Sequence, residues 1–246
     1  MLIGPQNSPL ISALTANLCA LQQEIMTSAC AADRTEDSVT LVAVSKGHPA
    51  EAVRAAAALG LKDFGESYLQ EALPKIEQLR SLNLTWHFIG RIQANKTRAI
   101  AEQFDWVHGL DRLHVAERLS TQRPHYAPPL QACIQVNIDG EAGKAGVEPQ
   151  AAESLAVALQ ELPRLRLRGL MCILPEGRGP AADRQSFAAL HALQRRINAR
   201  GLALDALSMG MSGDFREAIA EGATLVRIGT ALFGPRNHEP LGQKPV

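Results

Sequence analysis

Hydrophobic and polar residues alternate along this chain in two patterns, one typical of short buried strands and one typical of amphipathic helices. Runs rich in apolar and β-branched residues predict strands at 40–45, 63–66, 85–90, 105–110, 130–138, 167–173, 204–210 and 224–229. Between these runs, apolar residues at helical spacing predict helices at 49–60, 68–80, 95–104, 113–122, 150–162, 184–200 and 215–221. Several of these helical stretches end on glycine, which suits a left-handed helix cap.

A separate helix is predicted before the first strand. Its apolar stripe at helical spacing consists of Leu10, Leu14, Leu18, Leu21 and Ile25. Ser8 and Pro9 form a good N-cap and first-turn pair, and the polar run 33–37 should end the helix. We expect this N-terminal region, residues 1–38, to cover one side of the structure that follows.

The order of the predicted elements indicates an α/β fold. Eight strand–helix alternations force parallel strand pairing, and eight such units in about 200 residues favour closure into a single (β/α)8 TIM-type barrel. A doubly wound sheet is the alternative, but no GxGxxG motif follows the first strand. We expect the barrel to occupy residues 39–236 and a C-terminal tail to occupy 237–246.

Composition narrows the class of protein further. The chain has 246 residues, 46% of them hydrophobic, with 25 basic and 25 acidic side chains, which is enough apolar material for a full core. Zero net charge gives no general attraction to nucleic acid or to anionic membranes. No run approaches the ~18 apolar residues of a membrane span, and the N-terminus lacks the pattern of a signal peptide. We therefore expect a cytoplasmic protein that binds neither nucleic acid nor membrane.

The four cysteines indicate neither a metal site nor a disulfide framework. They form no CxxC motif and have no close histidine at the spacing of zinc ligands. Cys133 and Cys172 lie inside apolar runs, so we expect both to be buried, reduced thiols.

Candidate chemistry lies at the ends of the predicted strands, because TIM barrels carry their active sites at the carboxyl ends. Lys46 follows the apolar run 41–44, and an amine at the edge of a buried strand is a candidate Schiff-base nucleophile. Arg227 lies inside the last strand, and both faces of a barrel strand are covered. A guanidinium in that position must be paired with another group, either functional or structural.

Two glycine-rich segments, 208–214 and 227–234, follow strands seven and eight, where this fold commonly binds phosphate. Ser212 and Thr230 add hydroxyl groups to these segments. A lysine, an anion cradle and an arginine are what pyridoxal 5′-phosphate (PLP) requires for its aldehyde, phosphate and pyridine nitrogen. A class I aldolase would share the lysine and the phosphate site, but it also needs acid–base residues near the lysine, which the sequence does not identify.

Seven segments give a more specific indication of the protein family, and they occur in order over nearly the whole chain after residue 40. They are LVAVSK (41–46), DFGESYLQEALPK (63–75), WHFIGRIQANK (86–96), QVNIDGEAGKAG (135–146), LRGLMCI (167–173), SMGMSGDFREAIAEGAT (208–224) and VRIGTALFG (226–234). Together they resemble the pyridoxal phosphate homeostasis proteins, single-domain relatives of the alanine racemase barrel, the fold type III barrel of PLP proteins. The chain departs from that family at Ser67, where asparagine is usual, and at Gly213, where Asp or Asn is usual.

The resemblance implies a role for each candidate residue. Lys46 would carry PLP as a Schiff base, and Arg227 would lie toward the pyridine nitrogen. The phosphate would be held by Ser212, Gly229 and Thr230. The other cofactor contacts expected from this resemblance are Ser67, His87, Asn137, Met171 and Ser208.

The resemblance also bears on whether the protein is an enzyme. An arginine at the pyridine nitrogen disfavours ring protonation and makes the cofactor a poorer electron sink. Racemases with this barrel use a second base from an additional β-domain, and this chain ends shortly after the last strand motif, so we expect that domain to be absent. We therefore expect a non-catalytic, monomeric PLP carrier that buffers the cofactor or delivers it to apo PLP-dependent enzymes, thereby affecting amino-acid and keto-acid balance.

Two other functions are open at this point. The first is a weak PLP-dependent amino-acid racemase that uses Lys46 with a second base such as Tyr68 or His87. The second is a protein-interaction scaffold that has lost the cofactor, which the intact Lys46 and the RIGT segment at 227–230 disfavour.

Overall fold

The computed structural model describes residues 9–141 and 143–235. Within these residues, eight parallel strands close into a barrel in sequence order, and the last strand returns to pair with the first. The strands are β1 Thr40–Val44, β2 Asp63–Glu66, β3 Thr85–Phe88, β4 Trp106–Leu110, β5 Leu130–Gln135, β6 Leu165–Met171, β7 Ala206–Ser208 and β8 Leu225–Ile228. The predicted α/β barrel is confirmed, and the doubly wound alternative is wrong.

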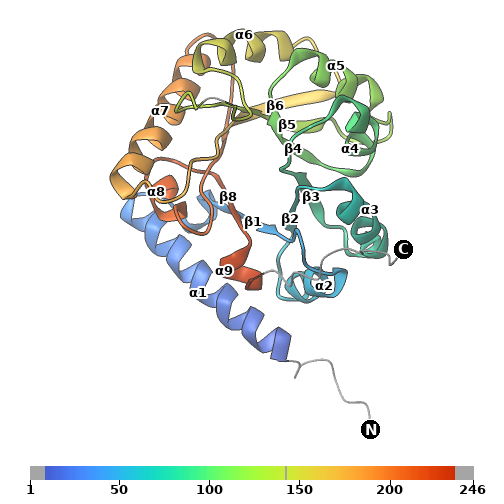
Figure 1. Ribbon diagram of the computed structural model, residues 1–246, viewed down its shortest axis with the longest axis vertical. Helices are drawn as coiled ribbons and strands as arrows, with labels where there is room; N and C mark the ends of the chain where they lie inside the picture. The colour runs from blue at the N-terminus through green and yellow to red at the C-terminus, as the bar shows by residue number, and fades with distance from the viewer. Residues whose placement is uncertain (1–8, 142, 236–246) are drawn as a thin grey trace, which may run out of the picture.

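Helices surround the barrel on its outside (Figure 1). They are α2 Ala50–Ala58, α3 Leu69–Gln78, α4 Thr97–Gln103, α5 Leu113–Gln122, α6 Pro149–Leu159, α7 Pro180–Asn198, α8 Phe215–Ala220 and α9 Thr230–Phe233, with short 3-10 helices η2 Glu36–Ser38, η3 Arg80–Leu82 and η4 Ala94–Lys96. The helices from α2 to α8 occupy the predicted positions. The sequence pattern did not predict α9, because its 4 residues are too few to show a helical period.

Two apolar layers hold the barrel together. The barrel interior contains a cluster of Val42, Cys133, Met171, Ala206 and Leu225, with Trp106 packed against it. A larger cluster fills the space between the strands and the helices and includes Val226 and Ile228. Successive residues of β8 therefore face opposite sides, as strand geometry requires, and Arg227 faces the interior together with Leu225.

The N-terminal helix α1, Pro9–Ala31, lies along one side of the barrel against α8, α9 and α2 (Figure 1). Its buried stripe is Leu14, Leu18, Leu21 and Ile25. The Asn17 side-chain amide donates a hydrogen bond to the carbonyl oxygen of Leu232 in α9, 3.0 Å away. The prediction that this helix covers one side of the barrel is confirmed, while its Ser8 cap and the tail at 237–246 lie outside the described residues.

Cys133 and Cys172 are buried, as predicted. Burial raises the pKa of each thiol to about 12, so both remain protonated at neutral pH. Among the described residues, His, Cys, Asp and Glu side chains form no group that could hold a metal ion. None of the helices in the described part of the chain is long and apolar enough to cross a membrane.

Candidate functional site

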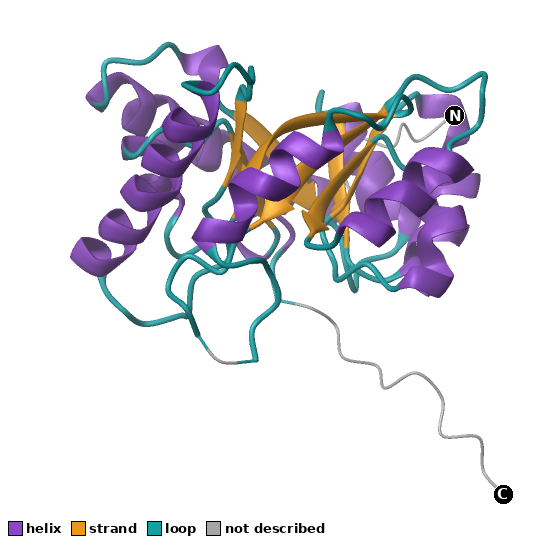
Figure 2. Cartoon of the chain, turned by 90° about the horizontal axis from the view of Figure 1, so that it is seen from above, coloured by secondary structure: helices purple, strands orange, loops and turns teal. Residues whose placement is uncertain are grey.

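A cavity of about 690 Å³ lies at the carboxyl ends of the strands, on the side of the barrel where long loops gather (Figure 2). Its walls come from the ends of several strands, including β1, β2, β5 and β8, and from the loop after β7. This is the end of the barrel at which the fold class places its functional residues.

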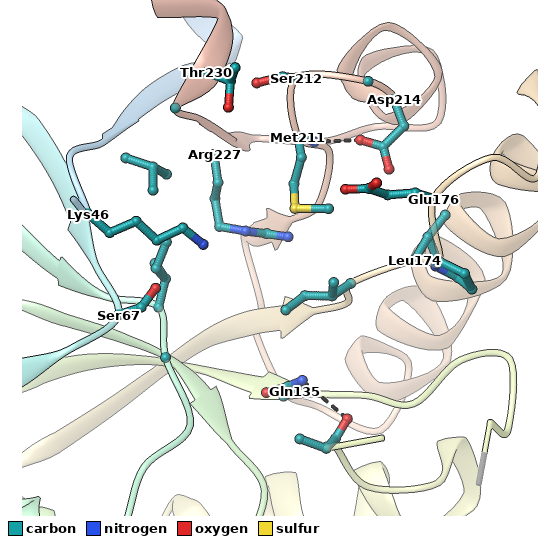
Figure 3. A pocket seen from close by; sticks show the side chains of 18 of the residues that line it. Lys46, Ser67, Gln135, Leu174, Glu176, Met211, Ser212, Asp214, Arg227 and Thr230 are labelled. Atoms are coloured by element: carbon teal, nitrogen blue, oxygen red, sulfur yellow. Dashed lines mark hydrogen bonds between the residues drawn. The ribbon is translucent and has the colours of Figure 1, made fainter. Parts of the chain in front are cut away.

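Six of the residues predicted to contact a cofactor line this cavity: Lys46, Ser67, Ser212, Arg227, Gly229 and Thr230. The side chains of Lys46 and Arg227 extend into the same space, and Ser212 and Thr230 lie together on one wall (Figure 3). The fold thus brings the predicted amine, cation and hydroxyl groups into one cavity, although they are far apart in the sequence.

The other four predicted residues are not part of the lining. His87 and Met171 are fully buried in the barrel. Asn137 fixes the loop after β5, since its side chain donates to the Glu141 carbonyl oxygen at 2.9 Å and accepts from the Glu141 amide at 3.2 Å. Ser208 lies beneath the cavity, where its hydroxyl contacts Arg227.

Gln135, which the sequence reasoning missed, lines the cavity at the end of β5. Its side-chain amide donates to the carbonyl oxygen of Ala145 at 3.1 Å and so ties the strand end to the following loop (Figure 3). Cys133 faces the barrel interior two residues earlier, so strand alternation would have identified Gln135 had the strand been ended at the correct residue.

Arg227 is a buried cation with two fixed hydrogen bonds. Its Nη1 donates to the Ser208 hydroxyl at 2.7 Å, and its Nη2 donates to the Cys172 carbonyl oxygen at 2.8 Å. Burial lowers the pKa of this guanidinium from its ordinary value, but an arginine side chain remains charged in proteins. Asp214 also lines the cavity, and burial raises the pKa of its carboxyl group despite the opposing effect of Arg227.

The wall formed by the loops after β7 and β8 is suited to an anion. The Ala231 amide donates to the Ser212 hydroxyl at 3.4 Å, so the two loops meet there. A Cβ atom at Gly229 would lie 3.1 Å from the carbonyl oxygen of Val44, which explains a glycine at this close approach of two strands. Hydroxyl and backbone groups on a wall of small residues can surround a phosphate closely.

Helix α3 fixes the backbone on both sides of Lys46, a feature the sequence reasoning missed. Lys75 donates to the Ser45 carbonyl oxygen at 2.8 Å and to the Glu66 carboxylate at 2.7 Å, and the Ser45 hydroxyl donates to the same carboxylate oxygen at 2.7 Å. One helical turn earlier, Glu71 accepts from the Gly47 amide at 2.9 Å. Glu71 and Lys75 are four residues apart on one helix face, and this spacing is the signal that the sequence offered.

The burial of this α3 contact has an electrostatic consequence. Glu66 is fully buried, and burial raises the pKa of its carboxyl group, while the charge of Lys75 and the hydrogen bonds from Lys75 and Ser45 oppose the increase. The backbone that carries Lys46 is therefore held by an ion pair out of solvent contact and has little freedom to move.

The geometry defines a class of protein: a parallel (β/α)8 barrel with a lysine, an arginine and a small-residue anion wall at its mouth. The family model for "Alanine racemase, N-terminal domain" matches residues 13–237. The chain belongs to this family, and the predicted family resemblance is confirmed.

Individual relatives agree with this assignment. The chain is 54% identical over 228 residues to the pyridoxal phosphate homeostasis protein of Pseudomonas aeruginosa, covering 93% of this chain and 98% of the relative. It is 45% identical over 229 residues to the protein of the same name from Escherichia coli K12, covering 90% and 96% of the two chains. The solved structure of PipY from Synechococcus elongatus PCC7942 with PLP bound has a TM-score of 0.79 and 37% identity, covering 90% of this chain and 100% of that one.

Proposed function

We propose that this protein binds PLP in the cavity at the barrel mouth and acts in intracellular PLP homeostasis, as a buffer or carrier of the cofactor. The observation that carries this proposal is the meeting of Lys46, Arg227, Ser212 and Thr230 in one cavity. The names of the relatives and the PLP-bound structure of PipY support it.

The cavity residues fit the chemical groups of PLP. Lys46 would hold the aldehyde carbon covalently through its amine, Ser212, Gly229 and Thr230 would hold the phosphate, and Arg227 would face the pyridine nitrogen. When bound, the cofactor supplies a conjugated ring that can withdraw electrons from an attached amine. A cavity of about 690 Å³ is also within the usual range of small-molecule sites.

The other predicted residues would contribute at different distances from the cofactor. Ser67 lines the cavity, so we propose a direct contact for it. His87 and Ser208 would act through Arg227, and Asn137 would act through the loop that it fixes. Met171 would support the barrel interior below the cavity.

We also propose that the protein is a carrier rather than a racemase. A permanent cation beside the ring nitrogen disfavours ring protonation and so weakens the electron sink that racemisation needs. The second bases considered for a racemase, Tyr68 and His87, do not line the cavity. Tyr68 is 59% exposed, and both ring nitrogens of His87 are engaged with Asp63 and His108.

The cofactor proposal is tested by visible absorption spectra of the protein with PLP, before and after borohydride reduction, followed by mass mapping of the modified lysine. We expect a new band that reduction removes, and a label on Lys46. Lys62→Ala, at an exposed position at the other end of the barrel, is the matched control and should behave like the wild type. A protein that takes up no PLP refutes the proposed function.

The carrier proposal needs two further measurements. Activation of an apo PLP-dependent enzyme by the loaded protein tests delivery, and size-exclusion chromatography tests the expected monomer. Incubation of the loaded protein with L-alanine and other amino acids, followed by optical activity, tests the racemase alternative. Sustained turnover above that of free PLP would replace the carrier with a weak racemase.

A further inference from the structure

Four hydrogen bonds run without a break through the centre of the barrel, from β2 to the cavity. The Asp63 carboxylate lies 3.0 Å from His87 Nε2, and His87 Nδ1 lies 2.9 Å from His108 Nε2. His108 Nδ1 lies 2.7 Å from the Ser208 hydroxyl, which lies 2.7 Å from Nη1 of Arg227. A cation at the cavity is thus joined to an anion at the amino-terminal end of β2.

Donor and acceptor chemistry gives this path a direction. Arginine can only donate, so the Ser208 oxygen accepts from Arg227 and the Ser208 hydrogen is available to His108 Nδ1. A neutral His108 then carries its proton on Nε2 and donates to His87 Nδ1, and His87 in turn donates from Nε2 to Asp63. The opposite order would require a proton on the Asp63 carboxyl group at neutral pH.

The surroundings of the two rings support this arrangement. Both histidines are fully buried, and burial together with His87 and Arg227 lowers the pKa of His108 well below its ordinary value, so it stays neutral. Trp106 stacks on His87 with ring centroids 5.6 Å apart and an interplanar angle of 12°, which restricts rotation of that ring. Asp63 is partly exposed and lines a groove between α1 and the barrel, whereas Arg227 lies at the other end of the path.

We propose that Asp63, His87 and His108 are positioning residues, which act through Ser208 to fix the orientation of the Arg227 guanidinium in the cavity. Chains of hydrogen bonds polarise one another, and this chain has a cation at its donor end and an anion at its acceptor end. Removing the negative charge of Asp63 removes the preference for one direction, so both histidines become able to adopt either tautomer. The predicted effect of Asp63 on cofactor binding rests on the proposed function, whereas the predicted tautomers of His87 and His108 do not.

The tautomers are measurable in the protein without PLP. Long-range ¹H–¹⁵N correlation spectra distinguish the two neutral forms of histidine, and the chain has only 7 histidines to assign. We expect His87 and His108 to be protonated at Nε2 in the wild type and to become mixed in Asp63→Asn. Asp37→Asn is the matched control, because Asp37 lines the same groove and is exposed, and it should leave both tautomers unchanged.

Two results overturn this part of the proposal. Protonation of either ring at Nδ1 in the wild type overturns the order of donors, and unchanged tautomers in Asp63→Asn overturn the role of the carboxylate. Asp63→Glu keeps the negative charge and should restore the wild-type tautomers. It also supplies the comparison if Asp63→Asn fails to fold.

The second measurement concerns the loaded protein. We expect Asp63→Asn to shift the visible absorption band of bound PLP and to raise its dissociation constant about two- to thirtyfold, a size typical of mutations that act through an intermediate network. Asp37→Asn should change neither quantity. An identical band and affinity in Asp63→Asn overturn the link to Arg227 while leaving PLP binding intact. Failure of the wild type itself to bind PLP overturns the proposed function, and the tautomer result stands separately.

Discussion

Lys75 Nζ lies 2.8 Å from the carbonyl oxygen of Ser45, the residue immediately before Lys46. The same ammonium pairs with Glu66, whose second carboxylate oxygen, Oε2, is buried and has no hydrogen-bond partner among the described residues. The position of the amine at the cavity therefore depends on a buried ion pair located between the sheet and α3.

Removal of Lys75 should be strongly destabilising. Lys75→Met would leave the Glu66 carboxylate buried without its partner, and breaking a buried ion pair in this way costs about 3–5 kcal/mol of unfolding free energy. Urea denaturation measures this loss. Lys62→Met removes an exposed lysine of the same size and should change stability by less than about 0.5 kcal/mol. A similar loss in both variants would show that the buried pair does not matter.

The double variant Glu66→Gln/Lys75→Met refines this test. It removes both charges, so it should be more stable than Lys75→Met alone. Equal stability of the single and double variants would contradict the interpretation that an unpaired carboxylate causes the loss.

Thr230 is expected to hold the phosphate in the proposed function. Thr230→Val should raise the dissociation constant for PLP about 10- to 100-fold, because a hydrogen bond to a charged group contributes about 1.5–3 kcal/mol. Equilibrium dialysis with PLP measures the change. Thr230→Ser retains the hydroxyl and serves as the control. Pyridoxal lacks the phosphate, so its affinity should be equal in the three proteins, and an equal loss for pyridoxal would place Thr230 elsewhere on the cofactor.

Much of the fold could be predicted because the barrel repeats one local pattern. Each strand is an apolar or β-branched run and each following helix is amphipathic, so neighbouring elements were recognised without knowledge of distant contacts. The end of β5 is harder to predict. Val136 and Ile138 continue the apolar pattern after the strand has ended at Gln135, and Val136 instead pairs with Val147 in an isolated bridge. The sequence therefore suggested Asn137 where Gln135 lines the cavity.

The sequence of a single strand also does not predict how deep inside the barrel each of its residues lies. The family resemblance implies a cofactor contact for His87, whereas its side chain is fully buried inside the barrel and contacts Asp63 and His108. Strand tilt and register decide such positions, and these depend on the neighbouring strands. By contrast, Lys46 and Arg227 both line the cavity, and the sequence places each of them at the carboxyl end of the barrel, Lys46 just after an apolar strand and Arg227 inside one.

Buried His108 gives the protein a specific dependence on pH. Burial lowers the pKa of His108 in the folded state below its ordinary value of 6.5, so the unfolded chain binds a proton that the folded protein excludes. Stability from this group is therefore present above pH 6.5 and is lost as the pH falls toward the folded-state pKa. For one such group the slope is at most about 1.4 kcal/mol per pH unit.

Urea denaturation of the wild type and His108→Gln between pH 7.5 and pH 5 measures this contribution. The difference in stability between the two proteins should shrink on acidification, because glutamine does not titrate. His125→Gln, at an exposed position, is the control and should follow the wild type at every pH. A difference that is constant with pH would mean that His108 has the same pKa in the folded and the unfolded state, which would contradict the lowering by burial.

The closest backbone approach at a glycine involves β6 and β7. A Cβ atom at Gly169 would lie 1.7 Å from the carbonyl oxygen of Ala206, a distance that only a backbone shift could relieve. Gly169→Ala should therefore lower the free energy of unfolding by about 3 kcal/mol or more, since overpacking against rigid backbone is costly. At Gly213, within the cavity wall, a Cβ would meet no atom within 4 Å, so Gly213→Ala should change stability by no more than about 0.5 kcal/mol. Urea denaturation measures the unfolding free energies of Gly169→Ala and Gly213→Ala. Equal stabilities of the two variants would mean that β6 and β7 approach each other less closely than the structure describes.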